Sequence, residues 1–340
     1  MNHPLKQIET RVNRTYMGGM MIDKFLGKQN CCDCNMPEDW ISSFVEAKNK
    51  EYIPNEGITR VETDHGIKLI TDVITKQDFG MGRTVPGVLI KYLDSMERLG
   101  IQVHPTKEYA KKHFNSKFGK TECWHILDTR EIDGEQPVVY IGFKEHVTKE
   151  LFRKLFINQD VDGMLDAMHK FEVKKGDTVL IRGGTPHAIG AGCFILEIQE
   201  PSDYTMRAET TTKGKPLTDK QIHYGVGIQN MLDCFDYTPK SREQTQNECF
   251  LKPTTNGQVT EYVNYLHTDC FKLEQITSDE YTFNKDDFAT FIIKKDGVMT
   301  SGGITYPVKK GEKYFISALC DDITIKDCDI LVCYGPKTNL

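Results

Sequence analysis

Four side chains in the first two thirds of the sequence could together bind a metal ion: Gln102, His104, Glu122 and His187. Gln102 and His104 lie two residues apart in the run IQVH, so on a strand they point to the same face. Glu122 opens the apolar run ECWHIL. His187 follows the glycine-rich turn at 183–186, where glycines let the backbone come close to a site. Only a fold that gathers distant segments could bring these four together.

Two imidazoles, one carboxylate and one amide oxygen form a ligand set of nitrogen and oxygen atoms. Such a set suits zinc and, less selectively, manganese, iron or cobalt. Spacing alone does not decide the matter, because a single internal histidine is more often a packed core residue. His125 lies on the opposite face of its strand from Glu122, so we do not expect it to join the set.

Short β-segments should position these residues. Residues 101–104, 122–127 and 137–143 are typical of strands, and Thr106 is a candidate N-cap for the polar helix KEYAKKHF. The run at 88–99 fits a helix or a buried strand equally well by its periodicity.

Residues 147–169 show a helical pattern that begins after a candidate cap at Thr148. We interpret this stripe as a helix pair that packs on the core. Its apolar positions are Leu151, Phe152, Leu155, Phe156, Met164, Leu165 and Met168. A further helix is predicted over 221–235.

From residue 261 onward the sequence alternates between short strand-like runs and turns with Gly or Asp. The runs are YVNYLH, CFKLEQI, ATFIIKK, ITYPVKKGEKYFIS, ITIK and DILVCY. This spacing is typical of a small antiparallel barrel or sandwich. VKKGE at 308–312 echoes VKKGD at 173–177, which suggests two related β-barrels in one chain.

The composition narrows the function classes. The chain has 340 residues, which favours two domains, and its net charge of −6 argues against a nucleic-acid binder. No stretch approaches the ~20 apolar residues that span a bilayer, and residues 1–10 lack a secretory apolar core. We therefore expect a cytoplasmic protein with no membrane partner.

The 11 cysteines fit free thiols in a reducing compartment. Cys31, Cys32 and Cys34 cluster near the start of the chain. No second pair of ligands stands at the usual zinc-site spacing, so we interpret the cluster as reduced thiols in a loop.

Four segments of the sequence resemble the type I mannose-6-phosphate isomerases, a cupin family. They are IQVHPTKEYAKKHF (101–114), GKTECWHIL (119–127), YIGFKEHVTKELF (140–152), and VKKGDTVLIRGGTPHAIGAG with FILEIQEPSDYTMR (173–207). The segments keep the family's order and spacing, and QVHP, GKTE and GTPHAIGAG are each specific. The first hundred residues match loosely, with PEDWISS where the family has a Trp-containing segment.

The resemblance implies that Gln102, His104, Glu122 and His187 are the metal ligands and that zinc is the cofactor. It also implies three further functional residues: Lys120 matches an active-site lysine, Glu197 an acidic residue of the pocket, and Arg207 the functional arginine of the family. Strand alternation agrees for Lys120 and Glu122, which share a face.

One position departs from the family pattern. Gly100 stands where relatives usually have a serine that contributes to phosphate binding, and the context of Arg207 is closer to eukaryotic relatives. Losing one hydroxyl removes a hydrogen bond worth roughly 1.5–3 kcal/mol to a charged oxygen. Arg207, Lys120 or backbone N–H groups could compensate, so the exact sugar stays open.

The implied reaction is the interconversion of mannose 6-phosphate and fructose 6-phosphate through a cis-enediol. Lys120, Glu197 or a metal-bound hydroxide could move the proton, and Arg207 could stabilise the enediolate or hold phosphate. Two alternatives stay open. One is another cupin enzyme, such as an isomerase of a different sugar or an iron-dependent oxygenase. The other is a sugar-binding protein without turnover.

The expected fold is mainly β, with two cupin-like jelly-roll β-barrels and a flanking helical segment. Residues 1–245 should form the metal-binding barrel, with a helical insertion at about 144–172 and a helical linker at about 213–240. Residues 246–340 should form a smaller, metal-free barrel. The expected partner is a small-molecule sugar phosphate, with no nucleic acid and no membrane.

Overall fold

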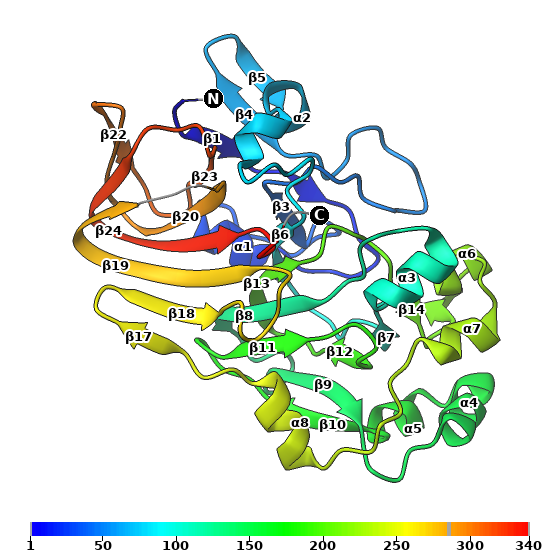
Figure 1. The fold of residues 1–340 in the computed structure, drawn as a ribbon. Helices are drawn as coiled ribbons and strands as arrows, with labels where there is room; N and C mark the ends of the chain where they lie inside the picture. Colours follow the sequence, from blue (N-terminus) through cyan, green and yellow to red (C-terminus); the bar gives the residue numbers. More distant parts are fainter. Residues whose placement is uncertain (1, 284–286, 339–340) are drawn as a thin grey trace.

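The computed structural model describes residues 2–283 and 287–338, and most of its regular elements are strands. All pairs between named strands are antiparallel, and three large sheets lie in stacked layers (Figure 1). The expected mainly β class is confirmed. Among residues 2–283 and 287–338, no helix combines the length and the apolar character needed to cross a membrane.

The middle layer, here called the central sheet, has six strands. In spatial order they are β11 (Thr178–Ile181), β8 (Glu122–Thr129), β13 (Cys193–Gln199), β6 (Leu89–Asp94), β3 (Glu38–Ile41) and β2 (Arg11–Val12). The run at 88–99 that fitted either helix or strand contains a strand, β6, and residues 95–99 lie beyond its end. The six residues of β6 are all buried, which explains why no alternation marked it.

The second layer, the C-terminal sheet, has eleven strands. Its main path runs β17 (Thr254–Asn256), β18 (Val259–Val263), β19 (Lys272–Phe283), β24 (Ile323–Tyr334), β20 (Ala289–Lys295), β23 (Lys313–Ile316), β1 (Leu5–Ile8), β4 (Arg60–Thr63) and β5 (Gly66–Leu69). Strands β21 (Gly297–Ser301) and β22 (Ile304–Val308) branch from β24.

Strand pairing crosses the expected division at residue 245. Strands β1, β4 and β5 come from the first seventy residues but join the C-terminal sheet, where Leu5 lies opposite Phe315. Lys313 also forms a buried ion pair with Asp39 of the central sheet. The division into domains 1–245 and 246–340 stays a prediction, and the N-terminal strands contribute to both parts.

The third layer, the outer sheet, has five strands: β10 (Met168–Glu172), β9 (Val138–Phe143), β12 (His187–Ile189), β7 (Gln102–Val103) and β14 (Met206–Arg207). Its outer face shares an apolar core with the helices α3 (Lys107–Phe114), α4 (Lys149–Asn158), α5 (Val161–Asp166), α6 (Asp219–His223) and α7 (Ile228–Asp233). The Phe and Met stripe predicted to pack on the core does so, with Phe152 and Met164 fully buried, although Met168 begins a strand.

The predicted caps Thr106 and Thr148 accept hydrogen bonds from the backbone of Tyr109 and Leu151. The single helix predicted over 221–235 is wrong. It is broken into α6 and α7, because Tyr224 has a φ of 53° and two glycines with positive φ follow it.

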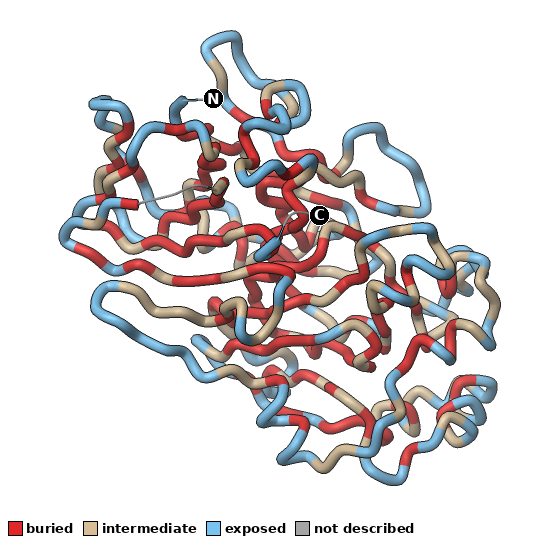
Figure 2. Tube along the Cα trace, in the orientation of Figure 1, coloured by how far each residue is buried: buried red, intermediate tan, exposed pale blue. Residues whose placement is uncertain are grey.

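The remaining elements are short. They are α1 (Met20–Phe25), α2 (Ile70–Val73), a 3₁₀ turn (Lys76–Phe79), α8 (Arg242–Cys249), and the β15 (Thr211–Thr212) and β16 (Lys215–Pro216) pair. Figure 2 shows buried residues concentrated along the stacked strands, whereas the β4–β5 hairpin is largely exposed.

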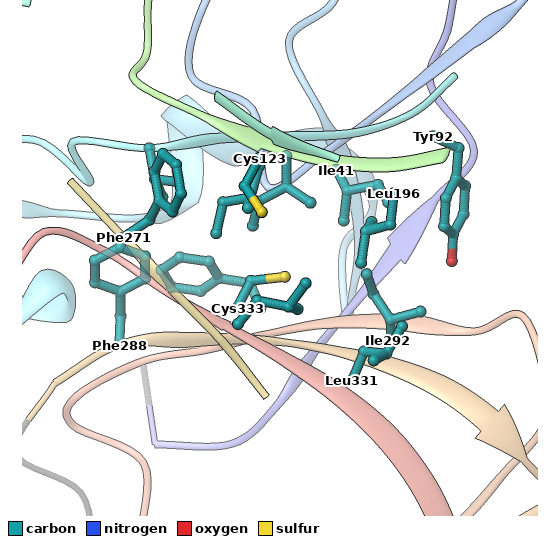
Figure 3. Packing of buried hydrophobic residues seen from close by; sticks show 14 of the residues in the cluster. Ile41, Tyr92, Cys123, Leu196, Phe271, Phe288, Ile292, Leu331 and Cys333 are labelled. Carbon is teal, nitrogen blue, oxygen red and sulfur yellow. The ribbon is translucent and has the colours of Figure 1, made fainter. Parts of the chain in front are cut away.

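Along each strand of the central sheet, successive side chains point alternately to the C-terminal sheet and to the outer sheet. Cys123, Leu196, Tyr92 and Ile41 pack against the C-terminal sheet, where Figure 3 shows them opposite residues such as Leu331. The residues between them point toward the outer sheet, and that side carries the candidate site.

Candidate metal centre

Three chain segments meet at the backbone of Pro105. The N–H of Lys120 donates to Pro105 O at 3.0 Å. A Cβ on Gly119 or Gly183 would lie 2.6 or 2.7 Å from the same oxygen, which is closer than atoms approach, so these two positions require glycine. The glycines of the GKTE and GGTPH motifs therefore allow both segments to lie beside QVHP.

The four predicted ligands come together between the central and outer sheets. Gln102 in β7 lies directly opposite His187 in β12, Glu122 begins β8, and His104 follows β7. Glu122 Oε2 lies 3.2 Å from His104 Nε2, and Glu122 Oε1 lies 3.4 Å from His187 Nε2. The amide nitrogen of Gln102 lies 3.1 Å from His187 Nε2. The structure thus brings all four side chains into one cluster.

Hydrogen bonds to backbone carbonyls orient both imidazoles. His104 Nδ1 lies 2.9 Å from Tyr204 O, and His187 Nδ1 lies 2.9 Å from Thr185 O. A carbonyl oxygen can only accept, so each Nδ1 carries the proton and each Nε2 presents a lone pair. Metal-binding histidines are commonly fixed in this way.

The cluster fits a divalent cation. Ligand atoms of His104, Glu122 and His187 all lie within 4.8 Å of one another, and all three residues are buried. Among the described residues, Glu122 Oε2 accepts no hydrogen bond although it is buried. A half-turn of the Gln102 amide would present its oxygen where the nitrogen now lies. These two nitrogen and two oxygen ligands suit zinc.

Burial and neighbouring charges hold the side chains of the cluster in the protonation states that bind a cation. Burial lowers the pKa of His104 to about 3, with Lys120 adding to the effect, so its imidazole is neutral. Burial also lowers the pKa of His187. For Glu122, burial raises the pKa, but the charge of Lys120 lowers it well below the ordinary value. Neutral imidazoles and a charged carboxylate are the forms that bind metal.

Lys120 lies directly beside the ligands. Its Nζ is 2.9 Å from His104 Nε2 and 3.2 Å from Glu122 Oε2, and the side chain is buried. Trp124 Nε1 donates to Glu122 Oε1 at 3.1 Å, which confirms that Trp124 and Glu122 share a face. His125 packs instead on Tyr262 of the C-terminal sheet, as expected from alternation.

Glu197 projects from the middle of the central sheet into the same space. It lies opposite Trp124 on one side and Lys91 on the other, and its Oε2 is 3.4 Å from Lys91 Nζ. Burial raises the pKa of its carboxyl to about 8, against the lowering effect of Lys91. Glu197 therefore holds its proton near neutral pH, close to the predicted ligands.

Further buried charged side chains lie next to Lys91. Lys91 also approaches Glu38 Oε2 at 3.8 Å, and Arg14 lies 3.0 Å from the same oxygen and 3.3 Å from Asp203 Oδ2. Burial raises the pKa of Glu38, but Arg14 and Lys91 hold it at about 2. Sequence reasoning did not identify Lys91, Glu38, Arg14 or Asp203. The available signals were a lysine within the buried run VLIKYL and the charged pair in PEDW.

Arg207 lies directly opposite Gln102 in the outer sheet, so both side chains belong to one face. Its guanidinium donates to the carbonyl oxygens of Thr205 and Gln221. Among residues 2–283 and 287–338, no carboxylate forms an ion pair with it. The three residues that the resemblance added are thus placed as follows: Lys120 at the ligands, Glu197 in the pocket, and Arg207 beside Gln102.

Cys31, Cys32 and Cys34 lie near α1, away from this cluster. They are exposed or partly exposed. Within the described parts of the chain, the cluster of His104, Glu122 and His187 is the one group of three or more such side chains close enough to hold a metal.

The chain is similar to curated mannose-6-phosphate isomerases. It is 31% identical over 229 residues to mannose-6-phosphate isomerase ManA of Bacillus subtilis (strain 168), covering 66% of this chain and 67% of the relative. It is 27% identical over 255 residues to the probable mannose-6-phosphate isomerase GmuF of the same organism, covering 75% and 76%. No protein-family model matches the chain.

Solved structures share the fold across nearly the whole chain. The crystal structure of the Bacillus subtilis mannose 6-phosphate isomerase superposes with a TM-score of 0.73 and 20% identity, covering 97% of this chain and 99% of that one. A zinc-bound mannose 6-phosphate isomerase gives a TM-score of 0.75 at 16% identity, covering 98% and 99%. With ManA matched at 31% over two thirds of its length, the chain belongs to the mannose-6-phosphate isomerase family.

Proposed function

We propose that this protein is a zinc-dependent aldose–ketose isomerase that interconverts mannose 6-phosphate and fructose 6-phosphate. The observation that carries the proposal is the buried cluster of His104, Glu122 and His187, in which both Nε2 lone pairs face the carboxylate. The names of the relatives supply the substrate. We further expect the enzyme to act in the cytoplasm, without a nucleic-acid or membrane partner.

Gln102, His104, Glu122 and His187 would hold the cation. When bound, a divalent cation polarises a sugar oxygen as a Lewis acid. Glu122 is the only charged group among the four ligands and therefore contributes most of the electrostatic attraction. The carbonyl groups of Tyr204 and Thr185 fix the two imidazoles in the tautomer that binds metal.

The reaction moves one proton between neighbouring carbons. A base takes the proton from C2 of the aldose and returns it to C1, while the hydroxyl proton on O2 passes to O1. Two buried groups of this pocket can serve in these transfers: Lys120, next to the ligands, and Glu197, whose raised pKa lets it give up and regain a proton near neutrality. Arg207, opposite Gln102, supplies positive charge for the enediolate.

Elemental analysis together with a coupled assay tests this function. We expect about one zinc per chain and interconversion of the two hexose phosphates by the zinc-loaded protein. His104→Ala should lose metal and activity together, because only one imidazole ligand remains. A zinc-loaded protein that converts no hexose phosphate would refute the proposal. Oxygen uptake with Fe(II) would instead support a cupin oxygenase, and tight sugar binding without product would support a sugar-binding protein.

A further inference from the structure

Most cations around the pocket are already neutralised by carboxylates. Lys91 lies 3.8 Å from the charged carboxylate of Glu38, and Arg14 pairs with Asp203. In contrast, no carboxylate in the described residues lies within ion-pair distance of the ammonium of Lys48. Lys48 therefore has positive charge that is available to a ligand.

A single residue, Tyr204, lies between Lys48 and the predicted metal ligand His104. Its Nζ is 3.8 Å from the ring centroid of Tyr204 and 5.7 Å from that of Tyr224. The carbonyl oxygen of Tyr204 in turn accepts the hydrogen bond of His104. One tyrosine thus contacts both a predicted metal ligand and the ammonium of Lys48.

The position of Lys48 is set by its backbone. Its N–H donates to Asp203 Oδ2 at 3.0 Å, and Asp203 is itself paired with Arg14. Lys48 is an exposed residue, and the Tyr204 ring packs against its ammonium. An ammonium has three N–H donors, so it can still donate to an anion. Asp203, which Arg14 pairs, adds negative charge near the ammonium, and Lys220 adds positive charge.

The surroundings of Gly100 do not favour an anion. A Cβ at Gly100 would lie 3.7 Å from Glu209 Oε1. That carboxylate pairs with Arg98 at 2.6 Å and accepts the N–H of Ile101 at 2.8 Å. A phosphate beside Gly100 would meet this carboxylate, and the one nearby cation, Arg98, is already neutralised.

We propose that Lys48 binds the phosphate group of the sugar substrate, beside the Tyr204 ring, and so determines the preference for phosphorylated sugars. The inference rests on the proposed function. The reacting carbons would lie at the cation, and the chain of the hexose would extend past Tyr204 to Lys48. Lys48 is a specificity-determining residue in this account and takes no part in proton transfer.

Binding of sorbitol 6-phosphate and of sorbitol to the zinc-loaded protein tests this role without turnover, because neither polyol has a carbonyl group to isomerise. Titration calorimetry should show that Lys48→Gln weakens sorbitol 6-phosphate binding by roughly 10- to 100-fold, the value of one charge-assisted hydrogen bond. Sorbitol binding and zinc content should not change. Lys48→Arg should recover part of the affinity, and Lys50→Gln, an exposed lysine two residues away, should leave it unchanged.

In the coupled assay, Lys48→Gln should raise KM for mannose 6-phosphate by a similar factor and change kcat by less than about threefold. Equal affinity of wild type and Lys48→Gln for sorbitol 6-phosphate would refute the inference, as would a wild type that does not distinguish the phosphorylated polyol from sorbitol. Failure of the proposed function looks different, because wild type would then bind sorbitol 6-phosphate through Lys48 but convert no hexose phosphate.

Discussion

The two faces of the central sheet share the same strands but have opposite chemistry. On strand β13, Leu196 packs into the apolar layer against the C-terminal sheet, while its neighbour Glu197 points into the pocket. On β8, Cys123 and Glu122 divide in the same way. All of β13 and the first six residues of β8 are buried, so exposure to water does not explain the difference.

The comparison separates residues that stabilise the fold from residues that serve the function. Burying charged groups costs free energy unless they are paired, and this side of the sheet contains several beside one another, including Glu122, Lys91 and Glu38. The apolar face stabilises the fold at no such cost. We therefore expect substitutions on one face to change activity and substitutions on the other to change the free energy of unfolding.

The largest effect should come from Glu122, the only charged predicted ligand. Glu122→Gln keeps the shape but removes the charge, so zinc content should fall well below one per chain. The value of kcat/KM should then fall by at least about 10³-fold. The matched control is Cys123→Ala on the opposite face, which should keep zinc and activity. A Glu122→Gln protein with full zinc and near-normal turnover would contradict the assignment.

Glu197→Gln should impair catalysis without removing the metal. A neutral amide cannot exchange a proton, so kcat should fall about 10²- to 10⁴-fold, the usual contribution of a general acid or base. Zinc content, measured by elemental analysis, should stay near that of wild type, because Glu197 is not one of the predicted ligands. Unchanged kcat would leave Lys120 as the proton carrier.

Leu196→Ala tests the apolar face at the adjacent position. Leu196 is fully buried between the central and C-terminal sheets, so the cavity should lower the free energy of unfolding by about 2–5 kcal/mol in urea denaturation. KM and kcat of the folded protein should match wild type. A large drop in kcat with little loss of stability would show that the two faces are not separable in this way.

The smallest effect concerns His125, which also faces the C-terminal sheet and bonds to Thr178 Oγ1 at 3.0 Å. Burial lowers its pKa from 6.5 to about 3, so the unfolded chain binds this proton at a higher pH than the folded chain does. Above pH 6.5 this group does not lower the free energy of unfolding. As the pH falls from 6.5 toward 3, the free energy of unfolding decreases progressively. At pH 5 the loss is about 2 kcal/mol.

Urea unfolding of zinc-loaded wild type and His125→Gln at pH 7.5 and pH 5 measures this contribution. The variant should lose about 2 kcal/mol less stability over that interval than wild type. Equal losses in both proteins would mean that His125 is not the titrating group.

Local sequence signals marked Gln102, His104, Glu122 and His187 as candidates, and the family resemblance then assigned them as ligands. The i, i+2 spacing of Gln102 and His104, the strand opened by Glu122, and the glycine turn before His187 each carried information that the fold retains. Glu197 and Lys120 came from the family resemblance; Lys120 lies beside Glu122, and Glu197 lies beside Lys91.

Residues that reach the pocket through long-range register were not predictable in this way. Lys91 lies opposite Glu197 only because β6 pairs with β13, and Glu38 comes near Lys91 only because β3 pairs with β6. Neither pairing has a local sequence signal. The insertion of β1, β4 and β5 into the C-terminal sheet is equally non-local. The break at Tyr224 was missed because a tyrosine rarely adopts a left-handed conformation.

The central claim is tested most directly by a crystal structure of the zinc-loaded protein with anomalous difference density measured at the zinc edge. The account predicts one strong peak between the sheets, with the Nε2 atoms of His104 and His187 at about 2.0–2.1 Å and oxygens of Glu122 and Gln102 at about 2.0–2.2 Å. No peak at that position, or a peak at Cys31, Cys32 and Cys34 instead, would contradict it.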